Sequence, residues 1–302
     1  MGAGTFDTKA YRSFTASAAH KSTDEIYSSH LNKNLDPKNI GMRESRDSAD
    51  NPQSTPIIVA LDVTGSMGMI ADVIAREGLG TLFTSILDRK PITNPHIMFM
   101  GVGDANCDRA PLQVSQFEAD KRIIEQLTQI YLEHGGGGNN FESYNLPWYF
   151  AAKHTVHDSY LKRAKRGYLF TVGDEEAPQA LTKEQIKNFI GDDVQSDIQP
   201  LASLEAAQRY YNVFHVVVKE GDHAKYYLNR VMKSWTELLG QHVIPLSDHK
   251  KLAETIVSAI EVAEGLSAKD SVAHWPTPIG SVVYDAVQHL PPGRSPKLIV
   301  GA

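Results

Sequence analysis

From Pro56 onward, short apolar runs alternate with longer segments in which apolar residues recur every three or four positions. The near-continuous apolar runs are typical of strands covered on both faces, and the helical spacing between them predicts crossover helices. This alternation predicts a doubly wound α/β domain, Rossmann-like, with a mostly parallel sheet and helices on both faces. The predicted strands are residues 56–62, 96–104, 167–175, 212–219 and 242–246.

The remaining segments complete the predicted organisation. Residues 111–116 (PLQVSQ) are too few for a crossover, so we expect one short antiparallel edge strand there. Residues 1–55 are rich in Ser, Asn, Asp and Lys, and residues 267–302 are interrupted by WPTPIG and LPPGRSP. Both patterns disfavour regular structure, so we expect an extended N-terminal arm, a domain at 56–266 and an extended C-terminal arm.

Composition narrows the possible partners. The chain has 302 residues, 41% of them hydrophobic, and a formal net charge of -6 with scattered Lys and Arg, which disfavours nucleic acid as a partner. It has no apolar run of the ~18 residues needed to span a bilayer, and its polar start lacks the order of a secretion signal. We therefore expect a cytoplasmic protein without a membrane partner. Cys107 is the only cysteine, which excludes an internal disulfide and a thiolate metal cage.

Oxygen-bearing side chains gather where the predicted parallel strands end, and ligands bind at this edge of such sheets. Three carboxylate-bearing loops at one edge repel each other unless a cation lies among them. With no thiolate ligands, a hard cation such as Mg2+, or else Mn2+ or Ca2+, is the expected occupant. The strand-end residues are Asp62, Thr64 and Ser66 after the first strand, Asp104 after the second, and Asp174 and Glu175 after a later one.

The loop HGGGGNNFES, residues 134–143, is the expected third contribution to the same site. Its four glycines allow a close backbone approach, and Asn139 and Asn140 bring amide oxygens to a tight turn. A helix predicted to begin near Met67 would point its positive end at the site and help to hold anions there.

Three segments in this order, ALDVTGSM, GGGGNNFES and FTVGDEE, resemble a von Willebrand factor A domain with a metal-ion-dependent adhesion site (MIDAS), of bacterial or phage type. The resemblance covers about residues 55–265. In that family an Asp-x-Ser-x-Ser motif ends the first strand, and here the matching residues are Asp62, Thr64 and Ser66. The family Asp after a later strand is matched by Asp174, with Glu175 as a competitor.

The second loop departs from the family. Where the family has Gly-Gly-Thr, this chain has Gly137, Gly138 and Asn139. The resemblance therefore leaves Asn139, Asn140 and Glu142 as alternative replacements for the family Thr.

The resemblance also implies a function. In the family, neutral hydroxyls are the main direct ligands and acidic residues mostly hold water, so the ion stays electrophilic and is completed by an acidic residue of a partner protein. The domain then docks a protein and performs no catalysis. Soluble bacterial and phage members often work beside AAA-type ATPases or as subunits of larger assemblies, which implies a partner of that kind and, for a phage protein, a place in the virion.

Other interpretations remain open. The chain could be a structural or assembly protein whose arms lace neighbouring subunits together, with the metal site secondary. It could also be a metal-dependent hydrolase, because a metal with many acidic neighbours can activate water. A haloacid-dehalogenase-type phosphatase needs a second Asp where this chain has Thr64. At the simplest, Asp62 to Ser66 is a strand end followed by a helix cap, and Asp104 is a solvated loop carboxylate.

Overall fold

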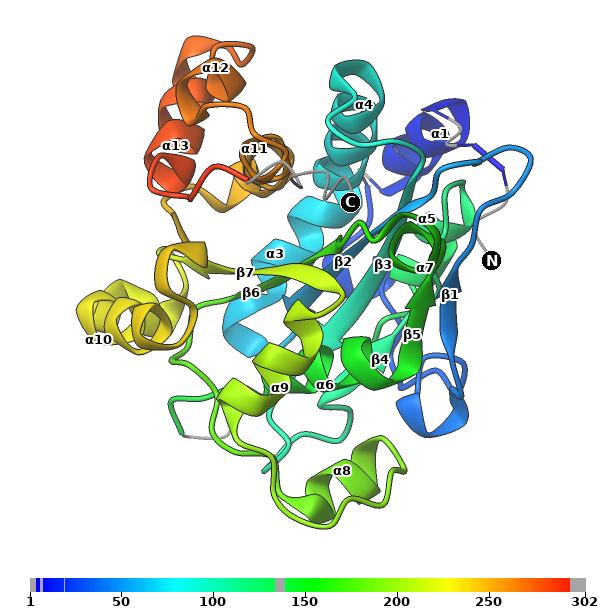
Figure 1. Cartoon of the computed structure of the whole chain (residues 1–302), viewed down its shortest axis with the longest axis vertical. Coiled ribbons are helices and arrows are strands. Elements are labelled where there is room, and N and C mark those ends of the chain that lie inside the picture. Colours follow the sequence, from blue (N-terminus) through cyan, green and yellow to red (C-terminus); the bar gives the residue numbers. More distant parts are fainter. Residues whose placement is uncertain (1–3, 6–7, 19, 134–138, 294–302) are drawn as a thin grey trace, which may run out of the picture.

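A six-stranded sheet forms the centre of the described chain (Figure 1). The computed structural model describes residues 4–5, 8–18, 20–133 and 139–293, and only the backbone of residues 8, 10, 15, 66 and 75. The strand order is β4-β3-β2-β6-β7-β8. The strands are β2 (Thr55–Asp62), β3 (Pro95–Val102), β4 (Leu112–Val114), β6 (Gly167–Gly173), β7 (Tyr211–Val218) and β8 (Val243–Leu246).

The strand pairing confirms the predicted fold class. Strands β3, β2, β6, β7 and β8 are parallel to their neighbours, and β4 pairs antiparallel with β3, with Met100 opposite Val114. The short run after the second predicted strand therefore forms the antiparallel edge, as its length required.

Helices cover both faces because the strands alternate between two hydrophobic clusters. Ile57, Val59 and Leu61 of β2 belong to one cluster, and Ile58 and Ala60 to the other. The first cluster receives side chains from α1 (Thr8–Ala18), α2 (Thr23–Ile26), α3 (Gly68–Val73), α4 (Leu79–Arg89), α5 (Arg122–Leu127), α11 (Leu252–Ala263) and α13 (Thr277–Val287). The second receives them from α6 (Asn145–His154), α8 (Lys183–Phe189), α9 (Pro200–Gln208) and α10 (Asp222–Leu239).

The N-terminal segment differs from the extended arm that we predicted. Helices α1 and α2 pack on the domain, and the Tyr27 hydroxyl donates to the backbone oxygen of Ala71 at 2.6 Å. Farther along, β1 (Arg43–Ser45) pairs in parallel with β5 (Thr155–His157), which precedes α7 (Asp158–Arg163). The prediction of an extended arm was wrong because a few buried apolar residues anchor a largely polar segment.

The C-terminal segment also differs from an extended arm. Helices α12 (Ala268–Val272) and α13 lie beside α11, as Figure 1 shows in orange and red. Val283 and Val287 are fully buried at helical spacing, and the Trp275 ring nitrogen donates to the Ser258 hydroxyl at 2.9 Å. The prolines of WPTPIG start α13 instead of breaking structure, because proline is tolerated in the first turn of a helix.

None of the helices in the described ranges is both long enough and apolar enough to cross a bilayer.

Candidate metal centre

The candidate site lies where the sheet topology changes direction. The chain leaves β2 toward β3 on one side, and β6 pairs with β2 on the other side. In open parallel sheets such a switch point leaves a crevice at the carboxyl ends of the strands, which is the usual place for a ligand. Asp62 is the last residue of β2 and Asp174 directly follows β6, so the topology brings these two carboxylates to one crevice.

Asp62 is fully buried and accepts three hydrogen bonds. Its Oδ1 accepts from the backbone nitrogen of Thr64 at 3.0 Å and from the Thr64 hydroxyl at 2.6 Å, and its Oδ2 accepts from the Tyr144 hydroxyl at 2.8 Å. Burial raises the pKa of Asp62 to about 7, with a further rise from the charge of Asp174, although the hydrogen bonds oppose it. Ser66 lies in the short 3-10 helix Gly65–Met67, and its side chain is outside the described part.

Asp174 is fully buried but only partly bonded. Its Oδ2 accepts from the backbone nitrogen of His223, in the first turn of α10, at 2.8 Å. Its Oδ1 is buried without a hydrogen-bond partner. Burial raises the pKa of this carboxyl group, despite the nearby backbone donors. Asp174 therefore offers one unsatisfied oxygen at the switch point.

Glu142 supplies a third acidic side chain from the loop before α6. It is 7% exposed, and its Oε2 is buried without a hydrogen-bond partner. Burial raises the pKa of Glu142 to about 10, and the next largest causes are the charges of Asp62, Asp108 and Asp104. The negative charges of the strand-end carboxylates therefore act directly on Glu142.

Glu175 belongs to the same electrostatic group. Burial raises its pKa to about 8, and the charges of Asp174, Asp62 and Glu176 add to the shift. One of its oxygens, Oε2, lies 3.4 Å from Nδ1 of His223. Glu175 is thus half-buried on the α10 side of the group, beside an imidazole.

The amide residues of the glycine-rich loop lie at the edge of the group. Asn139 is exposed; its Nδ2 donates to Oδ2 of Asp104, and its Oδ1 accepts from the backbone nitrogen of Phe141 at 3.1 Å. Asn140 accepts a backbone hydrogen bond from Glu176 at 3.2 Å, which joins this loop to the segment after β6. Residues 134–138 (HGGGG), which contain all four glycines of this loop, lie outside the described residues.

Asp104 is buried, in contrast to the solvated loop carboxylate that its position also allowed. Its Oδ1 accepts from the backbone and side-chain nitrogens of Asn106 at 2.9 and 2.7 Å. Its carboxylate therefore fixes the loop after β3 and the amide of Asn139 at the rim of the site.

This donor set fits a hard divalent cation. Two buried carboxyl oxygens, Oδ1 of Asp174 and Oε2 of Glu142, have no hydrogen-bond partner, and the acidic groups raise one another's pKa. Buried anions of this kind are stabilised by a positive charge among them, and carboxylate and hydroxyl oxygens are the ligands that Mg2+ and Ca2+ take.

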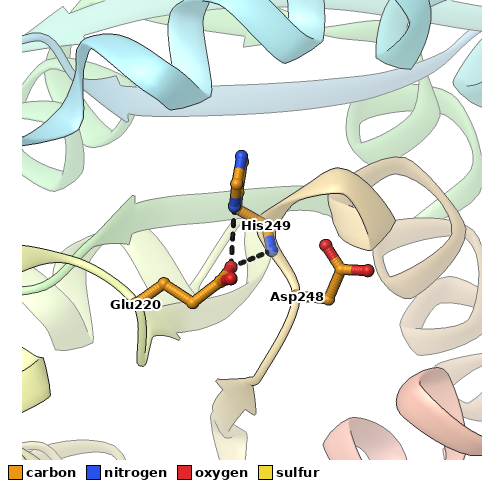
Figure 2. Close-up of side chains that lie close together, drawn as sticks. All are labelled: Glu220, Asp248 and His249. Atoms are coloured by element: carbon orange, nitrogen blue, oxygen red, sulfur yellow. Dashed lines mark hydrogen bonds and ion pairs between the residues drawn. The ribbon is translucent and has the colours of Figure 1, made fainter.

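A second group of side chains meets a purely geometric test for metal ligands. In the described residues, Glu220, Asp248 and His249 are the one such group whose ligand atoms all lie within 4.8 Å of one another. Figure 2 shows the carboxylate of Glu220 accepting from the backbone nitrogen and from Nδ1 of His249, both at 2.7 Å. Asp248 caps a 3-10 helix by accepting from the backbone nitrogen of Lys250 at 3.0 Å. Hydrogen bonds therefore already account for this group.

The sequence interpretation missed several residues that build the site. Tyr144 donates to Asp62, and a Cβ atom at Gly173 would lie 1.9 Å from the Tyr144 hydroxyl. A Cβ atom at Gly221 would lie 2.4 Å from the Cβ of Asp174. Both glycines are needed for these close approaches. No local pattern in the sequence linked Gly221 or Tyr144 to the strand ends.

Comparisons with known proteins give a likeness of fold. No family model matches the sequence, and no curated protein matches it. Two similar solved structures are both of the pilus adhesin SpaC from Lactobacillus rhamnosus GG. The open conformation has a TM-score of 0.46 and 11% identity over 72% of this chain, and the other structure has a TM-score of 0.44 and 10% identity over 71%. The match covers 31% of the adhesin chain in each case, so this chain spans under a third of the adhesin's length.

Proposed function

We propose that this chain is a metal-dependent docking module that binds Mg2+ at the ends of β2 and β6 and then accepts an acidic side chain of a partner protein. The observation that carries the proposal is the group of buried carboxyl groups at the switch point, with unpartnered oxygens on Asp174 and Glu142. A buried anion without a counter-charge destabilises a fold, so such a group is consistent with a cation as part of the functional state.

The roles of the residues follow the resemblance noted in the sequence. The hydroxyls of Thr64 and Ser66 would bind the ion directly, and Asp62 and Asp174 would hold its water ligands. From the middle loop, Glu142 is the buried candidate, and Asn139 and Asn140 remain alternatives. When bound, the ion supplies an electrophilic position for a carboxylate.

The surroundings of the site favour a protein as the occupant. Tyr226 and Tyr227 are 73% and 53% exposed in the first turns of α10, the helix whose start holds Asp174. The ring of Tyr227 lies 5.0 Å from that of His223, which contacts Glu175. Tyrosine is among the side chains that are enriched in protein interfaces.

The alternative of an assembly protein with lacing arms has less support. The described parts of both ends fold against the domain, in α1, α2 and β1 at one end and in α12 and α13 at the other. A metal-dependent hydrolase stays a second chemical alternative, to be tested by turnover of phosphoester and peptide substrates in Mg2+. An AAA-type ATPase or a subunit of a larger assembly remains the predicted kind of partner.

The test is a capture experiment with the full chain in native lysate, in Mg2+ and in EDTA. We expect the full chain to retain partner proteins in Mg2+ and to release them in EDTA. The Asp62→Ala variant should not retain them. Glu220→Gln, which changes a carboxylate at the same sheet edge, is the matched control and should keep them. Retention that is indifferent to both EDTA and Asp62→Ala contradicts the proposal. Metal-dependent turnover of a phosphoester or peptide substrate would instead support the hydrolase alternative.

A further inference from the structure

A π-helical turn interrupts the helix that follows the candidate metal loop, residues 62–67. The chain leaves this loop through α3, passes through the π turn Ile74–Gly78 and continues into α4. In the π turn the backbone nitrogen of Leu79 donates to the oxygen of Ile74, five residues earlier. Such turns are rare, hold more residues than an α-helical turn and are frequent at functional sites. Relaxation of this turn to an α-helix would shift the residues on one side of it by one position.

Two buried tyrosines of the N-terminal segment bond the backbone of this helix. The Tyr27 hydroxyl donates to the backbone oxygen of Ala71, just before the π turn, at 2.6 Å. The Tyr11 hydroxyl donates to the backbone oxygen of Arg76, inside the π turn, at the longer distance of 3.3 Å. Both tyrosines are more than nine-tenths buried. A shift of the Ala71 backbone would therefore take the acceptor away from a hydroxyl group that water cannot easily reach.

Arg76 connects the π turn back to the same N-terminal segment. Its Nη1 donates to the backbone oxygen of Ala18, and its Nη2 donates to that of Lys21 at 2.7 Å. Its Nε donates to Oδ1 of Asp72 at 2.7 Å, and the Thr23 hydroxyl donates to the same oxygen at 2.7 Å. The guanidinium group therefore ties the π turn to the end of α1 and to the start of α2.

The N-terminal segment contacts the helix on both sides of the π turn. Thr23 and Tyr27 bond residues before it. Beyond it, the Tyr11 ring packs on Gly80 in α4, where a Cβ atom would lie 2.0 Å from Cε1 of the ring, and Figure 1 shows α1 beside α4. Consecutive residues of an α-helix differ by about 100° around its axis, so a one-residue shift would rotate one side away from the segment. The residues that make these contacts, here called the N-terminal clamp, are Tyr11, Ala18, Lys21, Thr23 and Tyr27.

Relaxation of the π turn would also reach the metal loop. Helix α4 is longer than α3 and is anchored by the fully buried Leu82 and Ile86, so the displaced residue would move toward α3 and the loop. There the backbone nitrogen of Met67 donates to the oxygen of Thr64 at 3.0 Å, and the backbone nitrogen of Thr64 donates to Asp62. This connection is too short to absorb an extra residue unchanged. The place of Thr64 beside Asp62 therefore depends on the π turn.

We infer that the N-terminal clamp holds the π turn and thereby keeps Thr64 in the position in which the metal loop binds Mg2+. The clamped state is the metal-binding state, because it is the one in which Thr64 lies beside Asp62. The metal side of this inference rests on the proposed function, whereas the hold of the clamp on the loop does not. Release of the clamp weakens Mg2+ binding, and by linkage bound Mg2+ strengthens the clamp by the same factor.

The first measurement is amide hydrogen exchange of the full chain in EDTA. Tyr27→Phe keeps the ring and removes only the hydroxyl bond to Ala71, so the amides of residues 64–79 should exchange about fivefold faster. Arg76→Lys keeps the charge but lacks the planar fork that binds two carbonyls, and should accelerate them about tenfold. Tyr149→Phe is the matched control, because it removes a buried tyrosine hydroxyl bond on the other face of the sheet. It should leave these amides unchanged.

The second measurement adds Mg2+. At about 100 times its Kd, Mg2+ should slow the exchange of the same amides in the wild type by about tenfold or more, because openings that displace Thr64 lose the ion. Asp174→Asn alters the metal centre outside this helix and should show little slowing. Calorimetry should give an Mg2+ affinity about threefold weaker in Arg76→Lys, and the wild-type affinity in Tyr149→Phe.

Two results would overturn the inference. One is wild-type exchange of residues 64–67 in EDTA in both Tyr27→Phe and Arg76→Lys, since the loop would then be independent of the clamp. The other is Mg2+ that binds Arg76→Lys as tightly as the wild type and leaves exchange in α3 and the π turn unchanged, which would keep the docking function and remove only its clamp. A wild-type chain that binds no Mg2+ would contradict the proposed function and the metal side of the inference, and exchange in EDTA would still decide whether the clamp holds the loop.

Discussion

Two groups of acidic side chains lie at the carboxyl edge of the same sheet, and they differ in almost every physical respect. Asp62, Asp174 and Glu142 are buried at the β2–β6 switch point, and two of their oxygens have no partner. Glu220 and Asp248, at the ends of β7 and β8, are exposed or half-buried and already bonded. The pKa values move accordingly: that of Asp62 is raised to about 7, whereas that of Glu220 is lowered.

The difference teaches that closeness of ligand atoms is a weak sign of a metal site. The Glu220 group satisfies the distance test, and the side chain of Glu220 is 43% exposed, so water and hydrogen bonds stabilise its charge. At the switch point, burial removes water without supplying enough donors, so the carboxyl groups need a proton or a cation. Exposure and unsatisfied oxygens therefore separate the two groups better than distance does.

The largest expected effect is stabilisation of the fold by Mg2+. At about 100 times its Kd, an ion that binds only the folded state adds about 2.7 kcal/mol to the free energy of unfolding. Asp174→Asn should lose most of this gain while its amide oxygen keeps the bond from His223, and Glu220→Gln should keep it. Urea unfolding with and without Mg2+ measures the gain. Equal gains in the two variants would erase the distinction between the two groups.

The next effect is the pH dependence of the metal-free protein. Glu175 and Glu142, whose folded pKa values are about 8 and 10, still hold protons above pH 7 in the folded state, whereas their carboxyl groups are ionised there in the unfolded chain. Stability must therefore fall as pH rises from about 7 to 8.5, by up to about 1.4 kcal/mol per pH unit for each group. Urea midpoints in EDTA test this, and Glu142→Gln should flatten the fall.

For Glu220 we expect the opposite dependence of the free energy of unfolding on pH. Burial is the largest single cause and raises the pKa of Glu220, but the hydrogen bonds from the backbone and ring of His249, together with the charges of His249 and Lys250, lower it by more in total. A lowered folded pKa stabilises the protein above the unfolded value and is lost as pH falls through the folded value. Glu220→Gln should therefore leave the slope above pH 7 unchanged. A flattened slope in this variant would contradict the assignment of the alkaline fall to the switch point.

A smaller effect is expected from the hydroxyl of Tyr144. Tyr144→Phe removes the donor to Oδ2 of buried Asp62 and should cost about 1.5 kcal/mol at pH 8, where Asp62 is mostly ionised. Tyr149→Phe is the matched control, because Tyr149 donates to Asp192, whose side chain is 29% exposed and can bind water instead. Urea unfolding measures both losses. A larger loss in the control would mean that burial does not set the cost.

The smallest effect concerns Glu220 itself. An exposed ion pair contributes between about 0 and 1 kcal/mol, so Glu220→Gln should change the free energy of unfolding at pH 7 by no more than that. Mg2+ affinity, measured by calorimetry, should stay at the wild-type value. A clear loss of affinity would instead make the Glu220 group a metal site.

The strand ends show how much of the site can be predicted from the sequence. Asp62 and Asp174 could be placed at one sheet edge because each follows an apolar run, and parallel strands bring their carboxyl ends together. The roles of Tyr144 and Gly221 could not be predicted, because each depends on a contact with a residue more than forty positions away. The ends of the chain were misjudged for a related reason. Val283 and Val287 lie in a segment flanked by prolines, and only the packing of α13 against α11 and β8 makes them core residues.

The sequence by itself determined the α/β class, the antiparallel edge strand and the strand-end positions of Asp62, Thr64 and Asp174. Those features depend on local periodicity, which is a property of each segment's own sequence. The tertiary structure alone decided which carboxyl groups are buried, which oxygens lack donors, and that Glu142 joins the strand-end group while Glu220 does not. Burial and electrostatic energies arise between segments that are distant in the chain, so they exist only once those segments have packed together.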